Sequence, residues 1–214
     1  GLDRLAASKI LVFGIGGVGS YVCEALVRAG IGEFELVDGD IVDVTNINRQ
    51  LIAMHSTIGR PKTDVAAERM LDINPDVRVR PRRCFYRPEN NGEFDFSGFD
   101  YIVDAVDDVE AKVSIIVKAA EAGVPVISSM GTGNKMDPSA FRIADIWDTR
   151  ICPLARAMRR ELRRYGVGHV KTVYSEEVPK LSYRGTPATI SFVPAAAGLL
   201  IAKGVVEDLL SGSR

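Results

Sequence analysis

Acidic, amide and basic side chains follow one another closely after an apolar run of the sequence. Residues 38–50, DGDIVDVTNINRQ, contain Asp38, Asn46 and Arg49, and Lys62 follows further along the chain. Asp107 comes directly after another apolar run, YIVDAV. A carboxylate can bind ribose hydroxyls or a magnesium ion, and cationic side chains neutralise phosphate oxygens. Together these groups suit a nucleoside triphosphate under nucleophilic attack better than a dinucleotide.

A glycine-rich loop supplies the matching backbone feature. GIGGVG, residues 14–19, has the spacing G-x-G-x-x-G and lies between the apolar run KILVF and a helical segment. Glycines let the backbone approach a phosphate, and the helix that follows offers free N–H groups and its positive dipole end. Asp38 ends the next apolar run, where a ribose-binding acid is expected. The loop therefore predicts a nucleotide site, and tight packing of a helix on a sheet is the alternative.

The elements that must position these residues alternate between strands and helices. Apolar runs predict five strands and a sixth candidate, at 9–13, 34–38, 77–80, 101–106, 124–129 and 141–147. Helices are predicted from the glycine loop to about Ala29, over 62–73 and over 109–122, with Gly30 and Gly123 as stops. The irregular segments 87–99 and 175–188 are expected to be surface or lid loops. The alternation predicts an α/β fold: a Rossmann-like, doubly wound, mainly parallel sheet with helices on both faces and a C-terminal extension.

The composition is that of a soluble globular protein. Its 214 residues are 46% hydrophobic and 26% charged, with a formal net charge of -1, so any attraction to nucleic acid must be local. Three cysteines without a C-x-x-C pair predict neither disulfides nor a structural zinc site, which fits a cytoplasmic protein. The most apolar run, 190–202, is interrupted by Pro194, and no membrane span is expected.

Each charged residue of the predicted site also has a purely structural explanation. Arg49 and Lys62, taken singly, are explained equally well as solvated surface charges. Asp107 and Glu110 form an Asp-x-x-Glu pattern, which is a helix capping box. It is less plausible that all three residues have only these structural roles when they occur together with a glycine loop.

Five motifs together resemble the ubiquitin-activating-like adenylating superfamily. They are GIGGVG, DGD, NINRQ, GRPK and DAVDD, spread over about residues 5–133. The resemblance implies an ATP site built from residues of these motifs: Gly14, Gly16, Gly17, Gly19, Asp38, Asn46, Arg49, Gln50, Lys62, Asp107 and Asp108.

The same resemblance implies roles for the polar members of this site. Asn46 and Arg49 contact phosphates, Asp38 contacts the ribose, Lys62 contacts the triphosphate, and Asp107 holds magnesium. Arg49, Lys62 and Asp107 are then the catalytic residues. They stabilise charge on the attacked α-phosphate and the departing pyrophosphate, and no side-chain base is required.

The second half of the chain separates subfamilies. Sulfur-carrier activators commonly carry two C-x-x-C pairs for zinc, and this chain has none. SSMGTGNKMDP, ICPLARAMRR and ISFVPAAAGL instead resemble the tRNA threonylcarbamoyladenosine dehydratases. The resemblance implies an ATP-dependent, ligase-like reaction in which the threonyl carboxylate becomes an acyl-AMP and the neighbouring carbamoyl group attacks it to close a ring. We therefore expect one domain over 1–214, with an ATP-binding half at 1–133 and a tRNA-facing half at 134–214.

Expectations about partners follow from this resemblance. It implies a homodimer joined through a sheet edge and terminal helices, and it leaves a sulfur-transfer protein as a candidate partner. Family members usually carry a helix upstream of the position of Gly1, with an arginine that reaches the partner subunit's ATP.

A basic stretch predicts a helix that faces RNA. Five arginines fall at i, i+3, i+4, i+7 and i+8 and share one helical face: Arg156, Arg159, Arg160, Arg163 and Arg164. Leu154, Met158, Leu162 and Tyr165 are expected on another, apolar face. RVRPRRCFYR, residues 78–87, adds a second arginine cluster. Local basic surfaces predict tRNA binding that weakens with salt, and a solvated helix face is the structural alternative.

Cys152 begins this helix, where the helix dipole favours a thiolate, so it is a candidate reactive thiol. Ring closure needs no covalent enzyme intermediate, however, and buried structural cysteines are common. Cys23 is expected in the core, and His55 and His169 receive no role.

Three other functions stay open on the sequence. The alternative within the superfamily is activation of the C-terminus of a ubiquitin-like sulfur-carrier protein. An NAD-dependent oxidoreductase would be stabilised by NADH and not by Mg-ATP. A non-catalytic RNA-binding scaffold would bind tRNA regardless of Arg49→Ala and Lys62→Ala.

Overall fold

A seven-stranded sheet of order β3-β2-β1-β4-β5-β7-β6 forms the centre of the protein. The computed structural model describes residues 1–179 and 188–212. The strands are β1 (Lys9–Phe13), β2 (Glu33–Val37), β3 (Arg78–Arg82), β4 (Tyr101–Asp104), β5 (Val126–Ser129), β6 (Phe141–Asp145) and β7 (Lys171–Ser175). Among the strands of the described residues, only β6 and β7 pair in antiparallel fashion. The predicted α/β, mainly parallel fold with a C-terminal extension of the sheet is confirmed.

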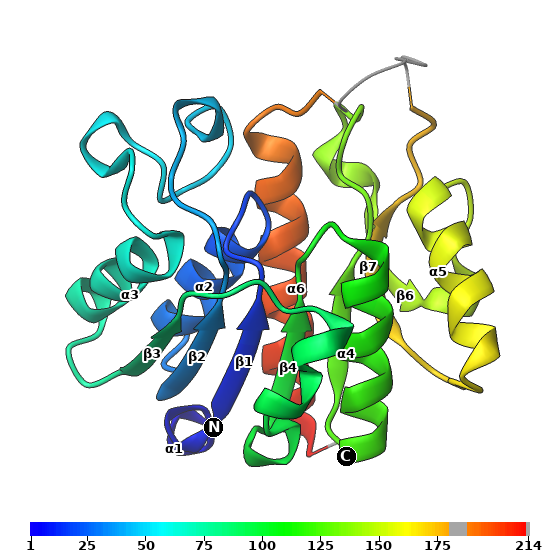
Figure 1. Ribbon diagram of the computed structural model, residues 1–214, viewed down its shortest axis with the longest axis horizontal. Coiled ribbons are helices and arrows are strands. Elements are labelled where there is room, and N and C mark those ends of the chain that lie inside the picture. The colour runs from blue at the N-terminus through cyan, green and yellow to red at the C-terminus, as the bar shows by residue number, and fades with distance from the viewer. Residues whose placement is uncertain (180–187, 213–214) are drawn as a thin grey trace.

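Helices cover both faces of the sheet, with α4 in front of it and α6 behind it in Figure 1. The helices are α1 (Leu2–Ala7), α2 (Gly19–Arg28), α3 (Lys62–Ile73), α4 (Val109–Ala122), α5 (Pro153–Arg164) and α6 (Phe192–Ser211). Short 3-10 helices are η1 (Val44–Asn46), η2 (His55–Thr57), η3 (Pro88–Glu93), η4 (Phe96–Gly98), η5 (Pro138–Ala140) and η6 (Ile146–Asp148). Among the helices that the structure describes, none is both long and apolar enough to cross a bilayer.

The central strands are apolar on both sides because both sides are covered. In β1, Ile10 and Val12 pack with α2, α3 and α6, while Leu11 and Phe13 pack with α4. A continuous apolar run such as KILVF is typical of a parallel strand enclosed in this way. The strands therefore form a rigid support whose carboxyl ends meet at one edge.

The predicted elements agree closely with the structure where local signals are strong. Helices 62–73 and 109–122 are confirmed, and α2 ends just before Gly30, which has a φ of +91°. The strand predicted at 77–80 is shifted, since β3 extends to Arg82 and includes Pro81. Pro81 is tolerated because β3 is an edge strand and need not donate on its outer side.

The segment 87–99 is irregular as predicted, but the prediction of a purely surface or lid loop is wrong. Phe94 and Phe96 are buried, and their rings lie 5.6 and 5.7 Å from that of Phe13. The segment thus closes the core beside α4. Of the second predicted loop, 175–188, residues 180–187 lie outside the described residues.

Candidate active site

A cleft of about 520 Å³ lies at the carboxyl ends of the parallel strands, the upper edge of the sheet in Figure 1. Open parallel sheets bind ligands at this edge. Nearly all the predicted nucleotide-site residues line it: Gly14, Gly16, Gly17, Asp38, Asn46, Arg49, Gln50, Lys62, Asp107 and Asp108. The exception is Gly19, which does not line the cleft.

The glycine loop presents bare backbone to the cleft. Gly14 has a φ of +86°, and a Cβ there would lie 2.7 Å from the carbonyl oxygen of Ala105. The amides of Gly16, Gly17 and Val18 donate no hydrogen bond to any described residue. Three free N–H groups before the helix α2 form a site for a phosphate. A Cβ on Gly19 would lie 1.8 Å from the Gly14 carbonyl oxygen, so that glycine serves close packing instead.

Asp38 is held rigidly at the end of β2. Its carboxylate accepts hydrogen bonds from the amides of Ile15, at 2.7 Å, and Asp40, at 2.8 Å. Burial raises the pKa of Asp38 above its ordinary value, and the two amides and the charge of Lys62 oppose that rise. The sequence thus places an enclosed acid beside the glycine loop, at the position expected for a ribose contact.

The two predicted cations enter the cleft from neighbouring segments. Arg49 donates to the Thr45 carbonyl oxygen at 3.0 Å and to Asn48 Oδ1 at 2.8 Å, which leaves other guanidinium N–H groups for a ligand. Lys62 begins α3, and its Nζ lies 2.7 Å from Asp40 Oδ2. The Lys62 side chain is only 7% exposed, so its charge is enclosed beside the cleft.

Asp107 and Asp108 differ in what they do. Asp108 Oδ1 accepts from the Ala111 amide at 2.8 Å and is the N-cap of α4. The alternative explanation of Asp107 as the N-cap of this helix is therefore wrong, because the N-cap is the next residue, Asp108. Asp107 is exposed, and within residues 1–179 and 188–212 its carboxylate forms no hydrogen bond or ion pair. It is the carboxylate that remains available to a ligand or metal ion.

The amides of the NINRQ motif are also ordered. Asn46 Oδ1 accepts from the Asp43 amide at 3.1 Å, which fixes the turn before Arg49. Gln50 is buried, and in the described part of the chain its Oε1 has no hydrogen-bond partner. An unpaired buried polar atom is uncommon, and a ligand or water in the cleft would relieve it.

Several residues of the cleft were missed by the sequence analysis. They come from the segment after β3, the segment after β5 and the second half of the chain: Cys84, Phe85, Tyr86, Ser129, Met130, Gly131, Thr132, Gly133, Leu154, Thr189 and Pro194. A Cβ on Gly39 would lie 2.5 Å from the Phe85 ring, so the glycine of DGD makes room for that ring. This glycine is the signal in the sequence that another group packs closely against the backbone next to Asp38.

A family model identifies the chain once this geometry is known. The model described as the ThiF family matches residues 1–210. The chain belongs to the ThiF family. The match covers both the glycine loop and the segments that were missed, so it does not depend on the nucleotide motifs alone.

Several relatives of this ThiF-family chain are tRNA threonylcarbamoyladenosine dehydratases. "tRNA threonylcarbamoyladenosine dehydratase" from Bacillus subtilis is 40% identical over 98% of this chain and 90% of its own length. The protein of that name from Haemophilus influenzae is 46% identical over 76% of this chain and 62% of its length. The crystal structure of the Escherichia coli tRNA N6-threonylcarbamoyladenosine dehydratase in complex with ATP has a TM-score of 0.93 and 34% identity, covering 99% of this chain and 89% of that one. The predicted resemblance to these dehydratases is confirmed.

In this ThiF-family chain Cys23 and Cys152 are buried, whereas Cys84 is partly exposed and lines the cleft. Cys152 is the N-cap residue of α5, as its sequence position predicted, but only 3% of it is exposed and it does not line the cleft. A reactive role for Cys152 stays a prediction, and the burial does not support it. Cys23 lies in the core as expected, where burial raises the pKa of its thiol to about 12.

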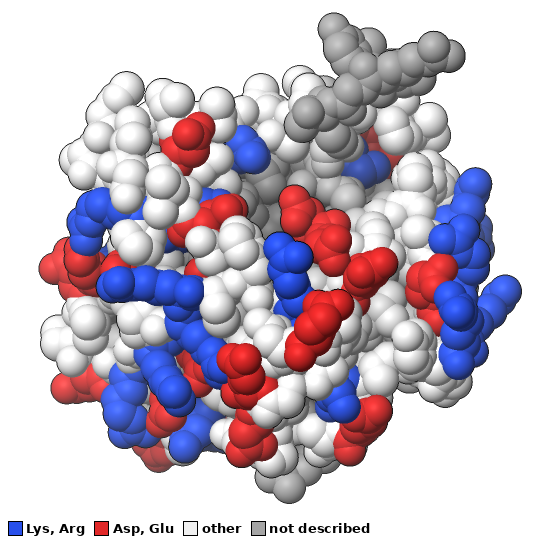
Figure 2. Space-filling view, in the orientation of Figure 1, with Lys and Arg blue, Asp and Glu red and all other residues white. Residues whose placement is uncertain are grey.

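The basic helix α5 carries most of its arginines on the outside. Figure 2 shows basic side chains gathered at the right edge of the molecule, over α5. Arg156, Arg160, Arg163 and Arg164 are exposed. Tyr165 is 61% exposed, so its assignment to the apolar face is wrong, and Ala155, Met158 and Leu162 form that face.

Arg159 differs from the other arginines of α5. Its guanidinium turns inward and donates to the Thr149 carbonyl oxygen at 3.0 Å, to Thr149 Oγ1, and to the Ile146 carbonyl oxygen at 3.4 Å. These contacts tie α5 to η6. The structure therefore gives Arg159 a structural role and leaves the others for a partner.

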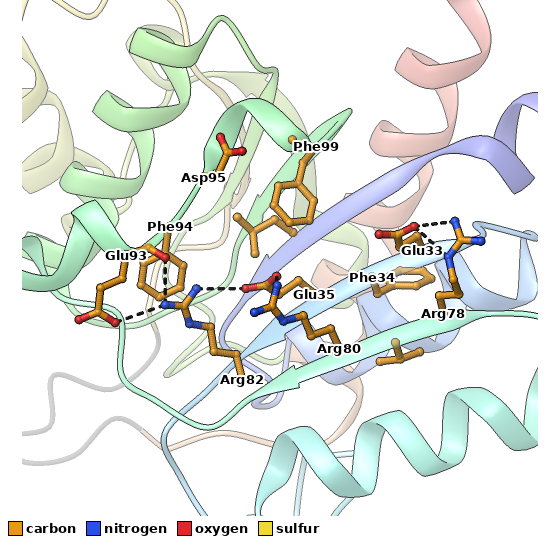
Figure 3. A pocket seen from close by; sticks show the side chains of 13 residues that line it. Glu33, Phe34, Glu35, Arg78, Arg80, Arg82, Glu93, Phe94, Asp95 and Phe99 are labelled. Carbon is orange, nitrogen blue, oxygen red and sulfur yellow. Dashed lines mark hydrogen bonds and ion pairs between the residues drawn. The ribbon is translucent and has the colours of Figure 1, made fainter.

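The second arginine cluster is not a free basic surface, which corrects the sequence analysis. Figure 3 shows its side chains along the uncovered face of β2 and β3, around a pocket of about 390 Å³. Arg78 lies 2.6 Å from Glu33, Arg80 lies 3.4 Å from Glu35, and Arg82 lies 3.3 Å from the same Glu35. Two acids on β2 thus contact three arginines on β3, and Arg82 also pairs with Glu93.

Proposed function

We propose that this chain is an ATP-dependent tRNA threonylcarbamoyladenosine dehydratase that adenylates the carboxylate of the modified adenosine. The observation that carries the proposal is the single cleft in which Arg49, Lys62 and Asp107 meet above the free amides of the glycine loop. Relatives of this name match nearly the whole chain, which supports the same assignment.

The proposed chemistry begins with attack of the threonyl carboxylate oxygen on the α-phosphorus of ATP. An O–P bond forms and the bond to pyrophosphate breaks. The carbamoyl group then attacks the acyl carbon and gives up a proton to solvent, the bond from the acyl carbon to the AMP oxygen breaks, and the ring closes as AMP is released. The oxygen of the lost water leaves with AMP, so the nucleoside loses one water for each ATP consumed.

The side chains of the cleft would contribute mainly charge and position. Arg49 and Lys62 would bind phosphate oxygens, and the glycine-loop amides would hold the phosphate nearest α2. Asp38 would accept hydrogen bonds from the ribose. Lys62 Nζ lies 2.7 Å from Asp40 Oδ2, so its charge is already enclosed and oriented before ATP arrives.

The residues present also fit a magnesium ion. Magnesium is usually bound by one or two carboxylates together with waters and substrate phosphates. Asp107 offers such a carboxylate in the cleft, and the described residues contain no group of three or more His, Cys, Asp or Glu side chains suited to a metal. Bound there, the ion would neutralise phosphate oxygens during pyrophosphate departure.

The exposed arginines of α5 form the proposed tRNA surface. Arg160 and Arg164 share Glu161, at 2.8 and 3.0 Å, so part of their charge is compensated. Arg163 lies 5.6 Å from the Trp147 ring, and Arg156 completes the exposed set. We assign the ATP site mainly to residues 1–133 and the tRNA contact to residues 134–214.

A homodimer in the cytoplasm is part of the proposal. The resemblance implies an interface at a sheet edge and terminal helices, where α6 exposes Phe192, Leu199 and Leu210. The segment between β2 and α3 exposes a second apolar set: Ile41, Val44, Met54 and Ile58. A sulfur-transfer partner stays a prediction, for which the buried Cys152 offers no accessible thiol.

The test is a mass measurement on the nucleoside. The protein is incubated with ATP, magnesium and tRNA carrying threonylcarbamoyladenosine, and the nucleoside is then analysed by mass spectrometry. The proposal expects the loss of one water, with one AMP and one pyrophosphate formed. An unchanged nucleoside, with pyrophosphate exchange that requires a protein ending in Gly-Gly and no tRNA, would establish the sulfur-carrier alternative instead.

A further inference from the structure

A fully buried ion pair lies directly beneath the proposed catalytic loop. Asp104 is the last residue of β4, and its Oδ2 lies 2.9 Å from the Nζ of Lys112 on α4. Neither side chain is exposed and neither lines the cleft. The Ser128 hydroxyl donates to the same carboxylate oxygen at 2.6 Å. The pair is thus part of the interior, one step behind the residues that would meet ATP.

Both members of the pair hold the backbone of one residue, Val106. Lys112 Nζ donates to the Val106 carbonyl oxygen at 3.2 Å, and the Val106 amide donates to Asp104 Oδ1 at 3.3 Å. The preceding amide, that of Ala105, donates to the Phe13 carbonyl oxygen of β1 at 2.8 Å. Asp107 follows immediately, so the position of its carboxylate depends on these backbone contacts.

The held backbone also abuts the glycine loop. The carbonyl oxygen of Ala105 is the atom that a Cβ on Gly14 would approach to 2.7 Å. Asp108 caps α4, and α4 carries Lys112 back to Val106, so the loop is fixed at both ends by the same helix. A shift of Val106 would therefore move Asp107 relative to the phosphate-binding amides.

A purely stabilising role explains this pair poorly. Desolvation of two charges offsets much of their attraction, and buried pairs can often be replaced by neutral residues of similar volume without loss of stability. We propose that the Asp104–Lys112 ion pair is a positioning device that fixes Val106 so that Asp107 points into the cleft. This inference rests on the proposed function, in which Asp107 holds magnesium beside the triphosphate.

The test uses a variant that removes both charges at nearly constant volume, Asp104→Asn with Lys112→Met. Either substitution alone leaves a buried charge unpaired and risks misfolding. The matched control is Tyr101→Phe, which removes another hydrogen bond of a buried side chain, from the Tyr101 hydroxyl to Asp208 Oδ2, at the opposite end of β4. Both variants are compared with the wild type by thermal unfolding, amide hydrogen exchange, ATP calorimetry and pyrophosphate exchange.

The double variant should remain folded, with amide exchange at Val106 about tenfold faster in the ligand-free protein because a charged hydrogen bond is lost. ATP affinity without magnesium should stay within about threefold of the wild type, whereas the tightening caused by magnesium should disappear. The adenylation rate should fall by about 100-fold, as expected for a misplaced catalytic group. Tyr101→Phe should change none of these quantities.

Two outcomes would overturn the inference. One is a folded double variant with wild-type exchange at Val106 and wild-type response to magnesium. The other is a double variant that does not fold, since the pair would then be needed for the whole domain. If the wild type itself is inactive, the proposed function is contradicted instead. Amide hydrogen exchange at Val106 in the ligand-free protein would still show whether the ion pair holds this backbone.

Discussion

The charged group of Lys62 is already held in position at the cleft in the ligand-free protein. Its ammonium is almost completely enclosed, yet it lies at the wall of the cleft and is held there by Asp40 at 2.7 Å. An enclosed charge interacts with a ligand more strongly than one in water, because the local dielectric is lower. The sequence predicted Lys62 from its motif, but the acid that holds it became evident only in the structure.

We expect Lys62→Met to lower kcat/KM for ATP by about 100- to 1,000-fold, the range found when one preorganised electrostatic contact to a transition state is removed. Arg60→Met is the matched control, because Arg60 pairs with Glu68 near the surface and does not line the cleft. Steady-state kinetics with modified tRNA would measure both. Equal activity of the two variants would show that Lys62 is an ordinary structural charge.

Asp38 predicts a pH dependence of stability. Burial raises its pKa in the folded protein above the ordinary value of 3.8. Such a group contributes stability below its unfolded pKa, and the contribution is lost as the pH rises through the folded pKa. The free energy of unfolding of the wild type, measured relative to Asp38→Asn, should therefore fall as the pH rises from the unfolded pKa of Asp38 to its higher folded pKa. A difference that grows with pH would mean that the amides of Ile15 and Asp40 outweigh burial.

At the scale of elements, the glycine loop connects β1 to α2. A side chain at its first residue, Gly14, would be unfavourable for two separate reasons. Gly14 combines a positive φ with a close approach to the Ala105 carbonyl oxygen. Gly30 also has a positive φ, of +91°, but nothing lies within 4 Å of its missing Cβ. A substitution at Gly30 therefore tests backbone strain alone, whereas a substitution at Gly14 tests backbone strain together with steric overlap.

Gly14→Ala should destabilise the protein by more than Gly30→Ala. The cost of a left-handed alanine is on the order of 1 kcal/mol at either site, and Gly14 adds the overlap with a backbone atom that cannot easily move. Urea unfolding of both variants would give the difference. Gly14→Ala should also weaken ATP binding, and equal stability losses would contradict the steric account.

The sequence predicted the elements whose signals are local and missed those that depend on distant partners. Helices α3 and α4 have periodic apolar residues and clear stops, and both were predicted to the residue. β7 is short and becomes a strand by pairing with β5 and β6. α6 packs one side against the sheet but also exposes Phe192, Leu199 and Leu210 on its other side, so it shows little amphipathic periodicity.

The candidate site divides in the same way. Residues within contiguous motifs, such as Arg49 and Lys62, were predicted because their spacing carries the signal. The Asp104–Lys112 pair was missed because an acid in an apolar strand and a lysine on the next helix show no pattern until they face each other. The arginines of β3 were predicted to form a free basic surface because the acids that pair with them lie on β2, far away in the sequence.

At the scale of the whole molecule, basic side chains are concentrated in one region although the net charge is only -1. Figure 2 shows mixed acidic and basic side chains at the lower left and mainly basic ones over α5. A local basic surface allows contact with a phosphate backbone without general attraction to polyanions. The fold thus places the proposed tRNA surface and the nucleotide cleft on one framework.

Arg156→Gln should weaken tRNA binding and reduce the slope of log affinity against log salt by about 1, because one phosphate contact is lost. Arg28→Gln is the control, since Arg28 pairs with Glu24 on α2, away from α5. Binding of modified tRNA over a range of salt concentrations would measure both slopes. Identical slopes for the wild type and Arg156→Gln would remove α5 from the proposed tRNA surface.

The most direct measurement is a crystal structure of this protein with magnesium and a non-hydrolysable ATP analogue. The account predicts a triphosphate across the glycine loop, with Arg49 and Lys62 on its phosphate oxygens and Asp107 on the metal ion. A triphosphate bound elsewhere, or one that only a single member of the three reaches, would contradict it.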